Sequence, residues 1–201
     1  NPTGTVFTEE EIAELIEPAC LLISDEIYEH ITYGEHRHFS PARLAREKTI
    51  LVQSLSKTYA MTGWRVGYCA APAAIIDRML LVLQQVSRGP ATFVQDAAAV
   101  ALDGPQDCVA SMRSEYARRR QMVMDALPGV LAPEGGFFAM VEVEADSNEI
   151  RRRLLDEFGV AVMHGSAYGE GGEGFLRVSF ANGSVLEEGL RRLREGLAAC
   201  S

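Results

Sequence analysis

The sequence lacks the features that mark membrane-spanning, secreted and nucleic-acid-binding proteins. It has no apolar run near the roughly 18 residues that a membrane span needs, and no signal peptide opens it. Its four cysteines lie far apart without C-x-x-C spacing, which predicts reduced thiols in a cytoplasmic protein and no metal site. The net charge of −9 argues against a nucleic-acid partner, because phosphate backbones are bound by concentrated Lys and Arg.

What the chain does contain is ordinary for a soluble globular protein. Hydrophobic residues make up 47% and charged residues 23% of its 201 residues. This length allows one large or two small domains with a buried core. The first residues, Asn1-Pro2-Thr3-Gly4, include no Met and are typical of an internal turn. We therefore expect the chain to be a fragment of a longer protein.

The first half of the chain alternates strands with helices. A capping box of Thr8 and Glu11 predicts a helix that ends near Ile16. Apolar runs predict three strands and, after Pro72, the pattern predicts three helices. The strands cover residues 20–24, 50–55 and 64–71, and the helices cover residues 73–86, 91–102 and 106–127. This alternation predicts an α/β fold with a mostly parallel sheet.

The pattern changes after Pro128, where shorter strands and helices predict a small α+β lobe. The expected strands are 137–143, 160–163 and 174–180, and the expected helices are 147–158, with Asn148 near its N-cap, and 184–199. We assign residues 1–104 to part of a large domain, 105–127 to a connecting helix and 128–201 to a small C-terminal domain. Three consecutive arginines, 118–120, predict a solvated face of the connecting helix.

The most informative segment runs from Ser54 to Tyr68 (SLSKTYAMTGWRVGY). Lys57 follows an apolar run and two serines, and Arg65 comes eight residues later in a glycine-containing turn. Such a set suits a cofactor that carries both a carbonyl and a phosphate, because an amine forms an imine while a guanidinium and a hydroxyl hold the anion. Asp25 and Tyr28 directly follow the first predicted strand, where α/β sheets bind ligands.

These segments resemble the class I/II aminotransferases of fold type I, which depend on pyridoxal 5′-phosphate and include aspartate aminotransferase. The similarity runs from Asn1 to the final helix but corresponds only to the C-terminal part of a family member. It implies that the large domain predicted above is part of the domain that binds pyridoxal phosphate. Lys57 is then the catalytic lysine, which forms a Schiff base and also moves the substrate's α-proton. Asp25 pairs with the cofactor's ring nitrogen, and Tyr28 contacts its O3′.

The resemblance assigns the remaining site residues in the same way. Ser54, Ser56 and Arg65 are expected to hold the cofactor phosphate. Asn1, in an N-P-x-G motif whose Asn-Pro bond is commonly cis in the family, contacts O3′. Arg177, in the motif G-F-L-R-V-S-F, grips the substrate α-carboxylate in a bidentate pair. The turn at residues 135–138 (GGFF) lines the substrate pocket.

Two residues depart from the family pattern. His164 stands where the family commonly has a proline, and a loop histidine there either reaches the substrate or is solvated. Arg88 replaces smaller residues in a region that touches the neighbouring subunit's site in many relatives, so a role in side-chain selectivity is open.

The resemblance implies an aminotransferase that moves an amino group from an L-amino acid to a 2-oxo acid by a ping-pong mechanism, as a cytoplasmic homodimer. Two alternatives stay open. A pyridoxal-phosphate-dependent C–S lyase would use the same lysine, aspartate and arginine for β-elimination. An aminotransferase-like sensing domain of a transcriptional regulator would follow a DNA-binding segment upstream.

Overall fold

The computed structural model describes residues 1–200, which form two compact units. The lysine unit comprises residues 7–32 and 37–111 and contains Lys57. The arginine unit comprises residues 1–6, 33–36 and 112 onward and contains Arg177. No helix within residues 1–200 combines the length and the apolar composition needed to cross a membrane.

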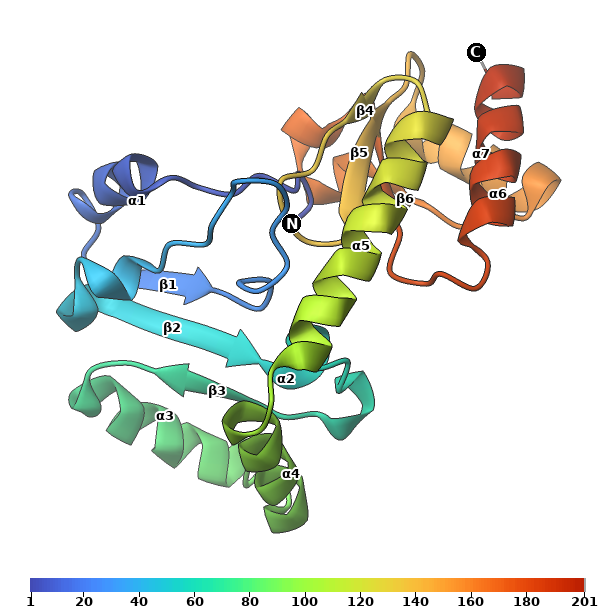
Figure 1. Ribbon diagram of the computed structural model, residues 1–201. Coiled ribbons are helices and arrows are strands. Elements are labelled where there is room, and N and C mark those ends of the chain that lie inside the picture. The colour runs from blue at the N-terminus through green and yellow to red at the C-terminus, as the bar shows by residue number, and fades with distance from the viewer. Residues whose placement is uncertain (201) are drawn as a thin grey trace. The chain divides into compact units, whose positions relative to one another are not determined.

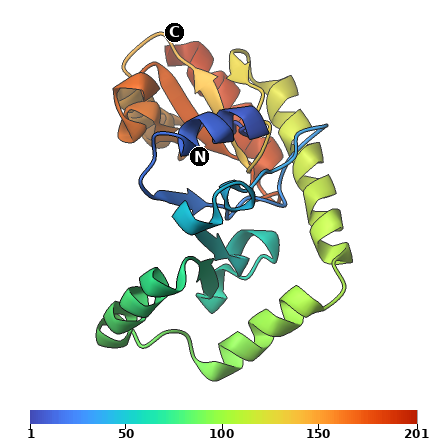
Figure 2. The ribbon, with the colours of Figure 1, turned by 90° about the vertical axis from the view of Figure 1, so that its left-hand side faces the viewer.

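The lysine unit is a three-stranded sheet with helices, in the α/β order that the sequence predicts. Its elements are α1 (Glu9–Ile16), β1 (Leu22–Asp25), β2 (Thr49–Ser54), α2 (Leu55–Thr58), β3 (Gly67–Ala70), α3 (Ala73–Val86) and α4 (Thr92–Asp103). Figure 2 shows α3 and α4 as consecutive helices joined by a short connection. Three 3-10 turns, Pro41–Arg43, Arg46–Lys48 and Thr62–Trp64, lie in the connections.

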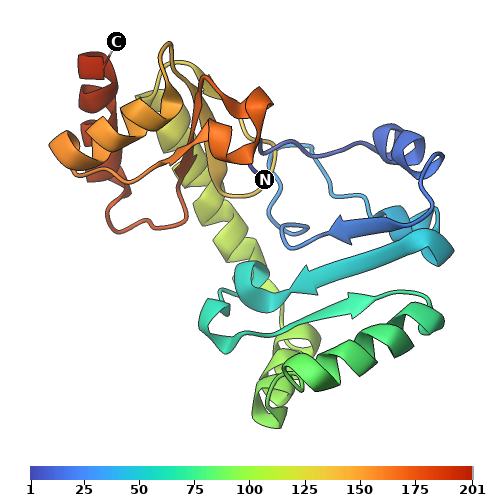
Figure 3. The same cartoon turned by 180° about the vertical axis from the view of Figure 1, so that it is seen from behind.

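The strand order is β1-β2-β3, as Figures 1 and 3 show from opposite sides. β1 and β2 run parallel, whereas β2 and β3 run antiparallel, so the prediction of a mostly parallel sheet is wrong for this part of the chain. The segment that joins β2 to β3 holds only one turn of α-helix and one 3-10 turn. A parallel connection is usually made by a full crossover helix, which this segment lacks, and the chain returns antiparallel.

The predicted helices match closely because their ends carry clear signals. Thr8 accepts a hydrogen bond from the Glu11 backbone, and the Glu11 carboxylate accepts one from the Thr8 backbone, which confirms the capping box. α3 and α4 differ from their predicted ranges by one residue at most. The buried core of the unit joins α2 and α4 to the residue before β3, through Leu55, Val94 and Val66.

The arginine unit is a four-stranded antiparallel sheet with helices. Its elements are the C-terminal part of α5 (Asp107–Ala126), β4 (Val130–Leu131), β5 (Phe138–Glu142), α6 (Ser147–Phe158), β6 (Met163–His164), β7 (Phe175–Ser179) and α7 (Leu186–Cys200), with 3-10 turns at Gly165–Tyr168 and Glu170–Gly172. The strand order is β4-β5-β7-β6. α6 and α7 lie side by side in Figures 1 and 3.

Direct pairing between the two central strands separates a core face from a second face. Leu176 and Val178 of β7 are buried, as are Ala139 and Val141 of β5, which are their direct partners. Side chains of successive strand residues point to opposite faces, so Arg177 lies on the other face of the sheet.

Two strands of this unit differ from the predictions. β6 covers only Met163–His164, because the Val160 backbone N–H donates to the Leu154 carbonyl and so closes the C-terminus of α6 instead of pairing in the sheet. The N-cap of α6 is Asp146, whose carboxylate accepts from the Glu149 N–H at 2.8 Å, and Asn148 lies near this cap, as predicted. The two-residue strand β4 was not predicted.

The three arginines 118–120 form a solvated face only in part. Arg118 is exposed and pairs with Glu115. Arg119 is largely buried and donates to the Ala181 carbonyl, and Arg120 donates to the Pro133 carbonyl at 2.6 Å. These two arginines therefore connect α5 to neighbouring loops of the arginine unit.

Candidate active site

Lys57 lies one turn beyond the C-terminal end of β2, on the short helix α2. Its side chain is half-buried, whereas Leu55, Ser56 and Thr58 around it are buried. The helix starts where Ser54 accepts a hydrogen bond from the Ser56 N–H at 3.1 Å. The amine is therefore carried by a fixed turn at the edge of the sheet where the parallel strands end.

The three residues predicted to hold a phosphate are close in structure as well as in sequence. The Ser54 and Ser56 hydroxyls lie 2.9 Å apart, and the Ser54 hydroxyl also donates to the Val66 carbonyl at 3.3 Å. Val66 directly follows Arg65, whose side chain is exposed. The two hydroxyls thus lie together at the end of β2, and the backbone of Arg65 lies two residues before the start of β3.

The backbone of Arg65 has a left-handed conformation, with φ 53° and ψ 48°. This conformation costs roughly 1–3 kcal/mol for a residue with a side chain and often marks functional sites. Its Nη1 donates to the Thr62 carbonyl at 2.9 Å, which closes the turn. The strained backbone is an independent observation that supports a functional role for Arg65.

Asp25 is the last residue of β1, which runs parallel to β2 and pairs there with Val52. Its side chain is exposed, and Tyr28 in the following turn is half-buried. The carboxyl ends of parallel neighbouring strands share one edge of the sheet, so Asp25 and Lys57 come from adjacent positions on that edge. The lysine unit therefore contains the amine, the carboxylate and the anion-holding residues predicted from the sequence.

Glu26 is a residue of this edge whose burial sequence reasoning missed, since it left the residue open between a supporting position and solvent. It is 2% exposed, and its carboxylate accepts hydrogen bonds from His38 Nε2 and Ser40 Oγ, both at 2.7 Å. Its backbone is bound to β2, since its N–H donates to Val52 and its carbonyl accepts from the Gln53 side chain. Burial alone raises the pKa of Glu26, but the hydrogen bonds from His38 and Ser40 outweigh this effect and hold the pKa below its ordinary value.

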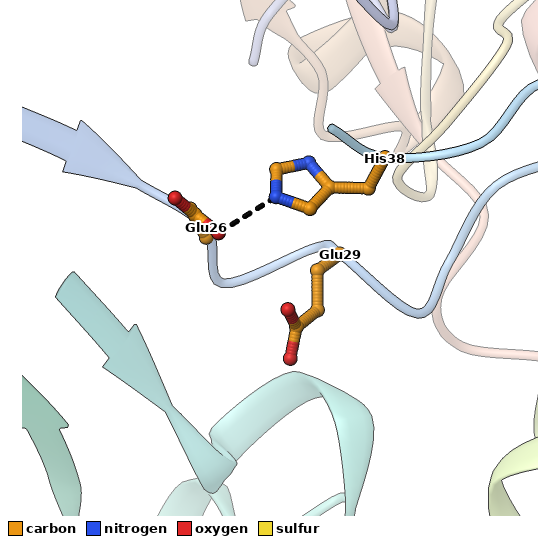
Figure 4. A group of neighbouring side chains, drawn as sticks. All are labelled: Glu26, Glu29 and His38. Atoms are coloured by element: carbon orange, nitrogen blue, oxygen red, sulfur yellow. Dashed lines mark hydrogen bonds and ion pairs between the residues drawn. The ribbon is translucent and has the colours of Figure 1, made fainter. Parts of the chain in front are cut away.

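Glu26, Glu29 and His38 are close enough together to resemble a metal-ligand group. Figure 4 shows the His38 ring directed at Glu26, with a bond drawn between them and none to Glu29. Glu29 instead lies 3.0 Å from His30. Both Glu26 oxygens already accept hydrogen bonds from protein groups. The cluster is therefore better explained as an internal support for the backbone next to Asp25.

Thr58, next to Lys57, is the second feature that sequence reasoning missed. Its hydroxyl is buried and has no hydrogen-bond partner among the described residues. Leaving a buried hydroxyl unpaired costs roughly 1–3 kcal/mol. An orphaned polar atom beside the lysine fits a site that a polar ligand completes.

The arginine unit brings together three segments that are distant in sequence. The carbonyl of Gly4 accepts from the N–H groups of Glu134 and Gly135, both at 2.8 Å. A Cβ atom on Gly4 would lie 2.6 Å from the Cβ of Pro133, and its φ is +80°, so only glycine suits this approach. The N-P-T-G segment and the GGFF turn therefore form one substructure, and the Asn1–Pro2 bond is cis, as the motif implies.

Arg177 joins this substructure from the middle of β7. Its Nη1 donates to Asn1 Oδ1 at 2.7 Å, and its guanidinium lies over the rings of Phe138 and Tyr168. Within residues 1–200, Arg177 has no carboxylate partner, whereas Arg118, Arg153 and Arg191 pair with glutamates. A half-buried guanidinium without an internal anion is suited to bind an external one.

The structure also locates the two departures from the family pattern. His164 pairs with Leu176 in β6, so its side chain lies on the face opposite to that of Arg177, and its Nδ1 lies 2.8 Å from Ser166 Oγ. Arg88 is exposed, with φ 57°, in the turn that follows α3.

Comparison with known proteins shows the family of the chain. The model of the family "Aminotransferase class I and II" matches residues 1–196. The chain belongs to this aminotransferase family. An aspartate aminotransferase of Pyrococcus abyssi is 39% identical over 98% of the chain and 55% of its own length. An arginine–pyruvate transaminase of Pseudomonas aeruginosa is 38% identical over 96% of the chain and 53% of its own length.

Solved structures of the family have the same fold. An aromatic aminotransferase from Pyrococcus horikoshii is 40% identical, with a TM-score of 0.94 over the whole chain and 58% of its own length. A Thermus thermophilus aspartate aminotransferase double mutant is 36% identical, with a TM-score of 0.88. The chain thus has an α/β aminotransferase fold and spans about half the length of the relatives it matches.

Proposed function

We propose that the protein is an aminotransferase that moves an amino group from an L-amino acid to a 2-oxo acid, with pyridoxal phosphate held by Lys57. The observation that carries the proposal is the edge of the lysine unit, where Lys57, Asp25 and Arg65 surround the ends of neighbouring strands. Membership of the aminotransferase family supports it. The residues fit the cofactor, since they offer an amine for its carbonyl, a carboxylate for its ring nitrogen and an anion clamp.

Each residue has a distinct task in this proposal. Bound pyridoxal phosphate supplies an electron sink for charge that develops at the substrate Cα. The Lys57 amine holds the cofactor and then carries a proton to and from Cα. The Asp25 carboxylate keeps the ring nitrogen protonated, because its negative charge favours the cationic form. Tyr28 and Asn1 are the proposed contacts of the cofactor's O3′.

The phosphate and the substrate need separate anion sites. Ser54, Ser56 and Arg65 are the proposed phosphate ligands, and the planar fork of an arginine suits a phosphate better than a point charge does. Arg177 is the proposed ligand of the substrate α-carboxylate, supported by its unpaired charge within residues 1–200.

The domain assignment, the assembly and the location are also parts of the proposal. Residues 1–104 belong to the large cofactor-binding domain, 105–127 connect, and 128–201 form the small domain. Exposed apolar side chains on α3, among them Leu81 and Val86, support a homodimer. The four unpaired cysteines are compatible with a cytoplasmic location. Sedimentation of the whole protein tests the dimer.

The central test uses the whole protein mixed with pyridoxal phosphate. We expect a visible absorbance band from the lysine-bound cofactor that is lost in Lys57→Ala and kept in Lys48→Ala, the matched control. An amino acid and a 2-oxo acid should then exchange the amino group without release of ammonia. A wild-type protein without the band contradicts the cofactor proposal. Pyruvate and free ammonia from a cysteine conjugate, without amine transfer, would instead favour the C–S lyase alternative.

A further inference from the structure

The guanidinium of Arg177 rests on two aromatic rings. Its central carbon lies 4.1 Å from the centre of the Phe138 ring and 5.0 Å from that of the Tyr168 ring. Both distances are within the range of about 6 Å in which a cation is attracted to a ring face. Phe138 reaches Arg177 from β5, because Arg177 pairs with Met140, two residues further along the same face of the sheet.

The second ring is carried by a loop that is itself firmly held. The backbones of Gly165 and Gly172 touch, so that a Cβ on Gly165 would lie 1.9 Å from the Gly172 carbonyl oxygen. The Glu173 carboxylate accepts from the N–H and the hydroxyl of Ser147, at 2.8 and 3.1 Å. The backbone hydrogen bond from Ser147 lowers the pKa of Glu173, so this anchor stays ionised. The position of Tyr168 at the end of its 3-10 turn is therefore set by the loop.

The rings of Phe138 and Tyr168 constrain the guanidinium of Arg177 without neutralising its charge. Ring faces contact the flat side of an arginine, whereas carboxylates bind at the N–H edge of its plane. Asn1 accepts from one of the five donors, and no carboxylate within residues 1–200 pairs with Arg177. A long arginine side chain otherwise samples many rotamers, and fixing it beforehand reduces the entropy that binding must overcome.

We propose that Phe138 and Tyr168 are positioning residues that hold Arg177 in the orientation that receives a carboxylate. The inference rests on the proposed function of Arg177, and it adds that the affinity for a carboxylate depends on the two rings. It also predicts that the phenol hydroxyl of Tyr168 is dispensable, because the ring face makes the contact.

The test measures carboxylate binding directly in the whole, cofactor-loaded protein. Propionate, which cannot react, is titrated while intrinsic fluorescence is followed, and KM and kcat are measured separately with an amino acid. Tyr168→Leu and Phe138→Leu should each raise the Kd for propionate and the KM by about twofold to thirtyfold, the range of a lost cation–ring contact. Because the rings act on binding, kcat should change less than KM.

Tyr168→Phe keeps the ring and should restore the wild-type Kd. Phe39→Leu is the matched control, because Phe39 contacts Arg43, 5.3 Å from its ring centre, in the lysine unit. It should leave the Kd for propionate unchanged. An unchanged Kd in Tyr168→Leu and in Phe138→Leu overturns the inference, provided that both variants keep the cofactor absorbance. A wild-type protein that neither shows this absorbance nor transfers amines overturns the proposed function instead.

Discussion

At the scale of single residues, the charges of Glu26 and Arg177 are compensated in opposite ways. Glu26 is buried and fully satisfied by His38 and Ser40, so its charge serves the structure around it. Arg177 is half-buried, and its partners within residues 1–200 are an amide oxygen and two ring faces, with no carboxylate among them. Buried charges normally need compensation, so an uncompensated one is a sign of function.

We predict that Glu26→Gln destabilises the protein in a pH-dependent way. The folded state lowers the pKa of Glu26 from its ordinary 4.5, so its contribution is complete above pH 4.5 and is lost as the pH falls through the folded-state pKa. At pH 7 the variant should lose about 1–3 kcal/mol of unfolding free energy, the range for hydrogen bonds to a charged group.

Urea unfolding of the whole protein at several pH values measures this difference. The gap between wild type and Glu26→Gln should narrow as the pH is lowered below 4.5. Glu29→Gln is the control, because the pairing of Glu29 with an exposed His30 is worth at most about 1 kcal/mol. A difference in unfolding free energy between wild type and Glu26→Gln that stays constant with pH would contradict a stabilising role for the ionised Glu26 carboxylate.

At the scale of elements, sequence patterns located the helices better than the strands. The capping box at Thr8 and the breaks at Gly104 and Pro105 are local, and local signals act within a few residues. Strand direction and length depend on distant partners, so the sense of β3 and the short β6 were not predictable from apolar runs. The contact between Arg177 and Tyr168 was not predictable for the same reason, because a folded loop brings the Tyr168 ring to Arg177.

The contact between β2 and β3 gives a prediction at this scale. Gly67 pairs with Ser54, and a Cβ at Gly67 would lie 2.5 Å from the Gln53 carbonyl oxygen. Gly67→Ala must push the strands apart beside the phosphate-holding serine, and we expect a loss of about 1–3 kcal/mol of unfolding free energy. Gly63→Ala is the matched control, because nothing lies within 4 Å of its added Cβ. Thermal or urea unfolding should separate the two variants, and equal stability would refute the steric argument.

At the scale of the whole molecule, the motifs predicted the family, which the comparisons show, but the residues assigned to the site do not lie in one compact unit. The predicted groups are divided between two units: Lys57, Asp25 and Arg65 in the lysine unit, Asn1 and Arg177 in the arginine unit. The chain spans about half the length of its relatives. Experiments on cofactor binding therefore concern the whole protein.

Cofactor binding should stabilise the whole protein, and the gain in unfolding free energy can be divided between Lys57 and the proposed phosphate ligands. A ligand at one hundred times its Kd adds about 2.7 kcal/mol to the unfolding free energy, so removal of pyridoxal phosphate should lower the unfolding temperature. In Lys57→Ala the increment should shrink to about 0.4 kcal/mol if the Kd rises a hundredfold. Lys48→Ala should keep the full increment.

A titration with inorganic phosphate distinguishes the stabilisation that comes from Lys57 from the stabilisation that comes from the phosphate ligands. Phosphate lacks a carbonyl, so any stabilisation that it gives reports the clamp of Ser54, Ser56 and Arg65 and should survive Lys57→Ala. Arg65→Ala should reduce the effect of both ligands, because a guanidinium supplies charge-assisted bonds to either anion. A Lys57→Ala protein that pyridoxal phosphate stabilises as fully as wild type would show that the lysine does not hold the cofactor. An Arg65→Ala protein with an unchanged response to both ligands would place the phosphate elsewhere.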